Sequence, residues 1–417
     1  MMACTKKEKE VCRMRNYLKY AVVLILAVAL LALGGISCAE EEVIKEGDTY
    51  KIGALFSVSG PYSPLGEPEK QTMEMMEAQI NEAGGINGHL LDIIVYDDES
   101  DTTKAEILAT RLVEQDKVLA IVGPTASGTS MPAVLVADDK HVPLVACAAS
   151  EPIVNDEEGN EREWTFMTPQ SSNQAARTIF GYLQDKLNIS KVAILTDKAG
   201  FGQMGVAALK AEAPKYGITI VAEQTFDNVN DKDMTPQLIN IENASPAAEA
   251  IICWGTSPGP AIITKNWADK QMGIPLIQSH GSLSNTYLQL SGDAANGVML
   301  PSGKFWVANQ LPDDDPQKAV LLDYIADFEA LYGQGKANTY GGHAYDALSL
   351  VIMALGEMEN GLTISEARTD IRDYIQNITG CVGTGGTFNM SPENHHGLTD
   401  DAMVMVQVVD GEWTWLK

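Results

Sequence analysis

The feature that most constrains the fold is a regular alternation of short apolar segments with longer amphipathic ones. Strands are expected at residues 51–56, 90–96, 118–122 and 142–145, where apolar residues are concentrated. Helices are expected between them at 67–83, 101–115 and 129–139, where apolar residues recur at helical spacing. An alternation of this kind predicts a parallel sheet with helices on both faces.

The same alternation begins again in the second half of the chain. Strands are expected at 191–196, 218–222, 250–253 and 275–278, with helices at 203–216 and 261–270. Two further helices, 344–358 and 364–375, and a hairpin formed by 403–409 and 412–416 complete the pattern. We therefore expect two copies of one α/β architecture and not a short repeat array.

The N-terminus has the pattern of a secretory signal of the lipoprotein type. An apolar run at 21–33 follows a basic stretch and ends in small residues before Cys38. The pattern predicts a signal peptide over 1–37, lipid attachment at Cys38 and a polar tether over 38–49. Two alternatives stay open. One is an uncleaved membrane anchor, because 20–37 is uncharged and about long enough to span a bilayer; the other is a freely secreted protein.

Charge and cysteine usage exclude several classes of function. The net charge is −27, so nucleic acids and anionic lipid surfaces would be repelled. Beyond Cys38 the cysteines are Cys147, Cys253 and Cys381, which have no metal-binding spacing. No HExxH motif and no GxSxG nucleophile elbow occurs. The sequence therefore predicts neither a metal, nor a cofactor, nor an enzyme.

One glycine motif allows two interpretations. Residues 200–205 (GFGQMG) match the GxGxxG fingerprint of dinucleotide-binding proteins, after an expected strand and at the start of an expected helix. The residues 196–199 separate that strand from the first glycine, whereas the fingerprint begins directly after its strand. A loop that lets another ligand approach a helix N-terminus accounts for the glycines equally well.

Two loops of small residues have the properties of an anion-binding site. Residues 123–130 and 147–150 each follow an expected strand, and open α/β sheets bind ligands at the carboxyl ends of their strands. Backbone N–H groups at a helix N-terminus, together with the hydroxyls of Ser127 and Ser150, favour an anion. Ordinary turns in which a serine caps a helix remain the alternative.

Six ordered motifs resemble one known family over residues 50–416. They are KIGALFSVSGPYSPLG, INEAGGINGHLLDIIVYDDESD, IVGPTASGTSMPA, VPLVACAAS, VAILTDKAGFGQMG and GGHAYDALSL. The chain resembles the extracytoplasmic solute-binding proteins of the branched-chain amino acid (Leu/Ile/Val) ABC transporter family. The resemblance implies the type I periplasmic binding protein fold, in which two Rossmann-like lobes with parallel sheets are joined by a three-strand hinge. It places the first lobe at 50–168 and 301–387, and the second at 169–300 and 388–417.

The resemblance also assigns the carboxylate end of a ligand. Ala126 and Ser127 match positions of the family that hold the ligand carboxylate, and so does the loop of Ala148, Ala149 and Ser150. Hydroxyl and backbone N–H groups are the donors that it implies at these positions.

Three more residues match ligand positions in the other lobe. Phe201 lies where relatives often have an aromatic residue, and Thr256 and His280 lie near the positions that surround the α-ammonium group in amino-acid binders. Relatives place an acid where this chain has His280, and a buried ammonium without a counter-charge is costly. A non-amino organic acid is therefore slightly favoured over a branched-chain amino acid. His280 also remains compatible with an ordinary surface loop.

The implied function is capture of a small carboxylate-bearing ligand by a lipid-anchored, extracytoplasmic receptor that delivers it to the permease of an ABC importer. The alternative is a ligand-sensing receptor that acts through a separate membrane signalling partner. Its discriminating feature, a second membrane span or a cytoplasmic module, is not found in the sequence after Leu33.

Overall fold

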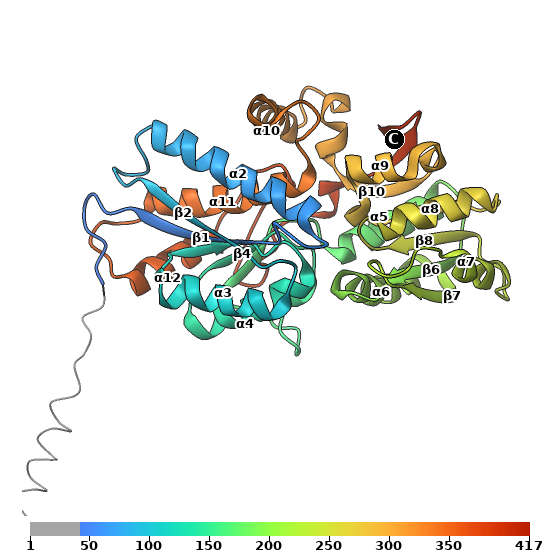
Figure 1. Ribbon diagram of the computed structural model, residues 1–417, viewed down its shortest axis with the longest axis horizontal. Coiled ribbons are helices and arrows are strands. Elements are labelled where there is room, and N and C mark those ends of the chain that lie inside the picture. Colours follow the sequence, from blue (N-terminus) through green and yellow to red (C-terminus); the bar gives the residue numbers. More distant parts are fainter. Residues whose placement is uncertain (1–41) are drawn as a thin grey trace, which may run out of the picture. The chain divides into compact units, whose positions relative to one another are not determined.

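The computed structural model describes residues 42–417, so the expected signal peptide and Cys38 lie outside the described part. Its first sheet is entirely parallel, with the strand order β2-β1-β3-β4-β5 (Figure 1). The strands are β1 (Tyr50–Phe56), β2 (Leu91–Asp97), β3 (Ala120–Val122), β4 (Leu144–Ala146) and β5 (Thr165–Met167). The first alternation predicts β1 to β4 of this parallel sheet, but it does not predict β5.

Helices cover both faces of the first sheet. On one face α2 packs against α11, and on the other α3 packs against α4. The helices are α2 (Ser63–Glu82), α3 (Thr102–Glu114), α4 (Ser127–Lys140), α10 (Gln317–Tyr332), α11 (Thr339–Glu357) and α12 (Ile364–Ile375). Residues far apart in the sequence thus build one layered unit, since α10, α11 and α12 come from the last third of the chain.

The second sheet has the order β14-β13-β10-β9-β8-β6-β7. Its strands are β6 (Lys191–Asp197), β7 (Thr219–Phe226), β8 (Ala250–Trp254), β9 (Leu276–Gln278), β10 (Met299–Gly303), β13 (Met403–Val409) and β14 (Glu412–Trp415). Neighbours from β7 to β10 pair in parallel, whereas β13 and β14 are antiparallel. The predicted hairpin is therefore the edge of this sheet.

The strand β6 shows how the second sheet is covered on both faces. Val192 and Ile194 pack among apolar side chains of α5 (Ser172–Asp185) and α6 (Gly200–Glu212). The alternate residues Ala193 and Leu195 belong to the cluster on the opposite face. Helices α7 (Thr235–Glu242), α8 (Gly259–Asp269) and α9 (Asn285–Ser291) contribute to that cluster. The period of two along the strand separates the two core layers.

Three segments of chain cross between the two sheets. They join β5 to α5, β10 to α10 through the 3₁₀ turn η5 (Lys304–Gln310), and β12 (Thr387–Phe388) to β13. In the first crossing, Gln170 donates from Nε2 to the Gly385 carbonyl oxygen, which lies in the loop before β12. Asp346 on α11 accepts from the backbone N–H groups of Thr384 and Gly385, both at 2.7 Å. The predicted lobe limits fall close to these crossings and stay a prediction.

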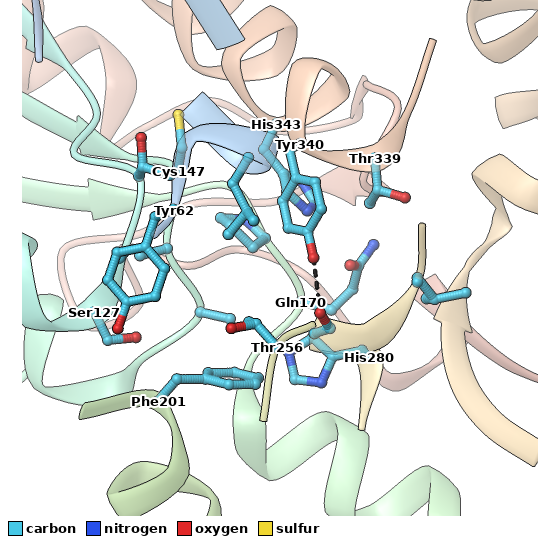
Figure 2. A pocket seen from close by; sticks show the side chains of 18 of the residues that line it. Tyr62, Ser127, Cys147, Gln170, Phe201, Thr256, His280, Thr339, Tyr340 and His343 are labelled. Carbon is cyan, nitrogen blue, oxygen red and sulfur yellow. Dashed lines mark hydrogen bonds between the residues drawn. The ribbon is translucent and has the colours of Figure 1, made fainter. Parts of the chain in front are cut away.

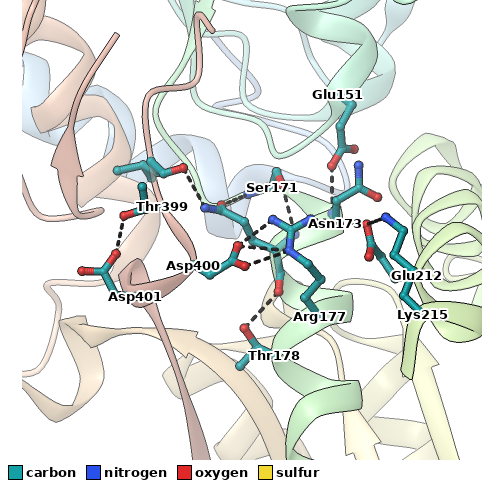
Figure 3. Close-up of polar contacts among 12 residues, drawn as sticks. Glu151, Ser171, Asn173, Arg177, Thr178, Glu212, Lys215, Thr399, Asp400 and Asp401 are labelled. Atoms are coloured by element: carbon teal, nitrogen blue, oxygen red, sulfur yellow. Dashed lines mark hydrogen bonds and ion pairs between the residues drawn. The ribbon is translucent and has the colours of Figure 1, made fainter. Parts of the chain in front are cut away.

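The last crossing segment is anchored on α5 (Figure 3). Arg177 donates from Nη2 and Nε to the Asp400 carboxylate, at 2.6 and 3.0 Å. Gln174 donates from Nε2 to the Leu398 carbonyl oxygen at 3.0 Å. A bidentate pair between an arginine and a carboxylate has a defined geometry, so this end of the segment is fixed on the second sheet's helices.

Several elements differ from the sequence-based expectation. The helix expected at 203–216 ends at Glu212 and continues as a 3₁₀ turn, Ala213–Tyr216, because Pro214 has no backbone N–H for the α-helical bond. The end of the expected tether is not free, since the Ile44 N–H donates to the Leu362 carbonyl oxygen at 2.9 Å. Within residues 42–417 no helix has the length and apolarity needed to cross a membrane.

Candidate ligand-binding site

The carboxyl ends of both sheets face one cavity (Figure 2). Its volume is about 60 Å³, which is several times the roughly 10–15 Å³ that one water occupies on the same measure. The predicted residues Ala126, Ser127, Ala148, Ala149, Phe201, Thr256 and His280 all line it. The structure therefore brings together residues from loops that follow β3, β4, β6, β8 and β9. Ser150 is buried beside the cavity at the start of a 3₁₀ turn and is not among its lining residues.

The first wall presents backbone donors from the turn before α4. Ala126 is the N-cap of α4, with φ −119° and ψ 147°, and no side chain caps the helix. Alanine is a poor N-cap residue, because it offers no acceptor to the first-turn N–H groups. Within residues 42–417 the backbone N–H groups of Ala148 and Ala149 likewise have no acceptor. Together with the Ser127 hydroxyl, this wall offers donors without partners.

The helix α6 brings a second uncapped N-terminus to the same place. Its N-cap is Ala199, again without a side-chain cap. A Cβ atom added to Gly200 would lie 3.2 Å from the backbone nitrogen of Gly128 on α4, so the first turns of α4 and α6 almost touch. Both first turns line the cavity. Helix N-termini carry partial positive charge and exposed N–H groups, so the cavity favours an anion although no Lys or Arg is among its described lining residues.

The close approaches at the glycine motif have a packing explanation. A Cβ atom on Gly202 would lie 1.9 Å from the Asp197 carbonyl oxygen, and one on Gly205 would lie 2.4 Å from the Trp254 ring. The helix α6 can lie directly on β6 and β8 only because these positions have no side chain. The packing of α6 therefore accounts for the motif without a nucleotide.

Aromatic rings form the wall contributed by the second sheet. The ring of Phe201 lies edge-on to the imidazole of His280, with 5.2 Å between centroids, and Trp254 lies edge-on to the same imidazole at 5.6 Å. Figure 2 shows Phe201, Thr256 and His280 on one side of the cavity and Tyr62, Tyr340 and His343 on the other. The site thus combines an apolar surface with a small number of polar groups, as small-molecule sites usually do.

His280 is part of the cavity wall and not of a surface loop. Both of its ring nitrogens are buried and have no hydrogen-bond partner. Burial lowers its pKa to about 4, so the imidazole is neutral at physiological pH. It therefore provides no positive charge, and no negative charge that would balance an ammonium group.

The structure adds residues that the sequence reasoning missed. They are Tyr62, Gln170, Asp197, Thr339, Tyr340 and His343. Tyr62 and His343 lie inside two of the quoted family motifs, 51–66 and 341–350, so those motifs contained a signal that was not used. Tyr340 donates from its hydroxyl to the Gly281 carbonyl oxygen at 2.8 Å, which joins α11 to the turn after β9.

Asp197 is the one carboxylate among the described lining residues. Its Oδ1 accepts from the backbone N–H groups of Ala199 at 3.2 Å and Asn228 at 3.4 Å. Burial raises its pKa, and these backbone bonds oppose the rise. The side chain orders the turn between β6 and α6. Within residues 42–417 no group of three or more His, Cys, Asp or Glu side chains is arranged to hold a metal ion.

A model of the periplasmic binding protein family matches residues 49–412. The chain belongs to the periplasmic binding protein family. It is 26% identical over 307 residues to the Leu/Ile/Val-binding protein homolog 1 of Brucella abortus (strain 2308), covering 73% of this chain and 76% of that protein. It is 23% identical over 276 residues to the leucine-, isoleucine-, valine-, threonine- and alanine-binding protein of Pseudomonas aeruginosa, covering 66% and 70% of the two chains.

Solved structures of periplasmic binding proteins have the same fold as this chain. Rp1789 of Rhodopseudomonas palustris aligns with a TM-score of 0.79 at 25% identity, covering 88% of this chain and all of that one. The branched-chain amino acid transporter substrate-binding protein LivJ of Streptococcus pneumoniae, solved in complex with isoleucine, aligns with a TM-score of 0.72 at 24% identity. It covers 88% of this chain and 100% of its own. The predicted resemblance to the type I branched-chain amino acid family is confirmed. The family consists of binding proteins, and membership implies a location outside the cytoplasm.

Proposed function

We propose that this periplasmic binding protein is the substrate-binding component of an ABC importer and that it captures a small carboxylate-bearing ligand. The observation that carries the proposal is the convergence of two uncapped helix N-termini, those of α4 and α6, on one cavity. Binding of Leu, Ile or Val by the named relatives supports a carboxylate ligand.

The two walls suggest an order of contacts. The ligand carboxylate docks on Ser127 and the backbone of Ala148 and Ala149, and Phe201 and Thr256 then close over it. The three crossing segments serve as the hinge between lobes at 50–168 with 301–387 and at 169–300 with 388–417. A ligand that touches both lobes stabilises the closed form through its differential contacts, and a permease recognises that form.

Within this class we favour a non-amino organic acid over a branched-chain amino acid. A buried ammonium group needs a counter-charge, and the neutral imidazole of His280 supplies none. Asp197 is the carboxylate that an amino acid would have to use instead. Binding assays with both kinds of ligand therefore decide between them.

The proposal is tested by mass spectrometry of the small molecule that co-purifies, followed by calorimetric titration of that compound, amino acids and organic acids. Ser127→Ala should weaken binding of the carboxylate ligand by about 10- to 100-fold, the range for a hydrogen bond to a charged group. Ser349→Ala is the matched control, because its hydroxyl donates to Tyr345 on α11, away from the cavity. A retained ligand without a carboxylate, or an unchanged affinity in Ser127→Ala, would contradict the proposal.

We further propose that the protein is held at the membrane through a lipid on Cys38. Membrane and soluble fractions of cells that produce the full chain test this directly. Cys38→Ala should move the protein to the soluble fraction if the apolar segment is still cleaved. A protein that stays in the membrane fraction after this change would support the uncleaved anchor instead.

A further inference from the structure

His280 and His343 are two imidazoles whose hydrogen-bonding capacity the protein leaves unused. Both ring nitrogens of His280 and Nδ1 of His343 are buried without a partner. Among residues 42–417, His343 forms no side-chain hydrogen bond at all. Buried polar groups are normally paired, since an unpaired group keeps its full desolvation penalty. The two side chains are therefore available to a ligand.

The two imidazoles come from different parts of the fold, and both line the cavity. His343 and Tyr340 lie three residues apart on α11, with ring centroids 6.5 Å apart. Tyr340 in turn donates to the carbonyl oxygen of Gly281, the neighbour of His280. Figure 2 shows His280 on the wall with Phe201 and Thr256, and His343 beside Tyr340 on the facing wall. A ligand that occupies the cavity therefore lies between the walls that carry them.

Both imidazoles are neutral donors. Burial lowers the pKa of His280 to about 4 and that of His343 to about 3, and His280 further lowers the pKa of His343. A neutral imidazole has one N–H donor and one acceptor nitrogen. An oxygen acceptor satisfies the two donors, whereas an alkyl group leaves them unpaired.

We propose that His280 and His343 bind a second oxygen acceptor of the ligand, at the end opposite its carboxylate, and so select against simple aliphatic acids and α-amino acids. The oxygen acceptor could belong to a carbonyl or to a second carboxylate of the ligand. The inference rests on the proposed function, because it takes the uncapped helices at Ser127 and Gly200 as the site of the first carboxylate.

The test is a calorimetric series of ligands with equal chain length. It compares pentanoate, 4-oxopentanoate, glutarate and norvaline with the full mature protein. Each hydrogen bond gained from an imidazole corresponds to about a 2- to 10-fold change in affinity, so two of them correspond to about 5- to 100-fold. We expect 4-oxopentanoate or glutarate to bind about tenfold or more tightly than pentanoate and norvaline.

Two variants assign this selectivity to the imidazoles. In His280→Phe and in His343→Leu, the ratio of the affinities for the best acceptor-bearing acid and for pentanoate should fall towards one. This ratio is measured within one preparation, so it does not depend on the fraction that folds. His141→Asn is the control, because His141 lies outside the cavity at a left-handed helix end, where asparagine is tolerated; its ratio should equal that of the wild type.

The outcomes separate the inference from the proposed function. If pentanoate binds as tightly as the acceptor-bearing acids, if norvaline binds most tightly, or if both variants keep the ratio, the inference is wrong and carboxylate binding stands. If no acid in the series binds and Ser127→Ala changes no ligand-induced thermal shift, the proposed function fails and the inference fails with it.

Proton uptake on binding distinguishes a carbonyl acceptor from a second carboxylate. A second carboxylate raises the pKa of the imidazoles, so glutarate binding at pH 5 should take up protons, measured by titration in two buffers with different ionisation enthalpies. A carbonyl adds no charge, and 4-oxopentanoate should bind without such uptake. The other titratable groups that line the cavity are Tyr62, Cys147, Asp197 and Tyr340; Asp197→Asn, run in parallel, separates its protons from those of the imidazoles.

Discussion

The hydroxyl of Tyr340 donates to the carbonyl oxygen of Gly281 at 2.8 Å, which connects a helix over the first sheet with a turn after a strand of the second. The bond joins the two walls of the cavity. Under the proposed hinge closure it would exist only in the closed form, so its energy would favour that form over the open one.

Removing this hydroxyl should weaken ligand binding without unfolding either lobe. Tyr340→Phe keeps the ring and removes one hydrogen bond, whose net value is about 0.5–1.5 kcal/mol, or about a 2- to 10-fold loss of affinity. Tyr332→Phe is the matched control. Its hydroxyl also donates to a backbone oxygen, that of Gln71, but both residues belong to helices over the first sheet. Calorimetry should show weaker binding for the first variant only. Equal affinities in both would show that the Tyr340 bond has no part in closure.

The near contact of Gly200 with Gly128 should make closure sensitive to a single methyl group. A Cβ atom at Gly200 would lie 3.2 Å from the Gly128 nitrogen, although alanine favours a helix more than glycine does by about 1 kcal/mol. Gly200→Ala should therefore keep or raise the stability of the unliganded protein and lower its affinity for the ligand. Gly356→Ala serves as the control, since a Cβ atom there meets open space. Tighter binding in Gly200→Ala would contradict this account.

Asp346 should be essential for the geometry of the loop between β11 (Cys381–Val382) and β12. Its buried carboxylate accepts from Thr384 and Gly385, and an amide in its place offers one acceptor atom where two are used. Asp346→Asn should lower the free energy of unfolding by about 1–3 kcal/mol, measured by urea denaturation. Asp327→Asn on the exposed side of α10 should change it little.

The neutral imidazole of His280 should make stability depend on pH in a defined window. Its pKa is about 4 in the folded protein against an ordinary value of 6.5. Between these values the unfolded chain binds a proton that the folded protein does not, so stability rises with pH through this window, by at most about 1.4 kcal/mol per pH unit.

Urea denaturation at several pH values between 4 and 7.5 measures this contribution. Wild type should gain stability relative to His280→Phe as the pH rises from about 4 to 6.5, and the difference should be constant above that range. Asp346 has the opposite sign, because burial raises its pKa to about 7, but it is present in both proteins and cancels. A difference that does not vary with pH would show that the imidazole is not held neutral.

Local sequence patterns predicted β1 to β4, β6 to β9, β13, β14 and the loops of small residues, because these depend on neighbouring residues. They missed β10 because Pro301 lies in its middle, and proline within an apolar run argues against a central strand. They also missed α10, whose N-cap is Pro316 and which has no capping side chain. Its start is marked by no local signal.

Some residues of the candidate site could likewise be predicted from local patterns, and others could not. Ser127 and Ala149 follow predicted strands, so their position at a sheet edge could be predicted. His343 and Tyr340 reach the cavity because α11 returns over the first sheet from a distant part of the chain. That path is a property of the topology, which no local periodicity near these residues contains, although the family motif at 341–350 includes His343.

The alanines at the starts of α4 and α6 leave helix N–H groups that the proposed carboxylate ligand would bind. A serine or aspartate at either position would stabilise its helix by about 1 kcal/mol and would also occupy the N–H groups that face the cavity. The unliganded receptor therefore has two incomplete helix ends, one on each side of the opening. A bound carboxylate that accepts from both helix starts would act as a common N-cap for α4 and α6.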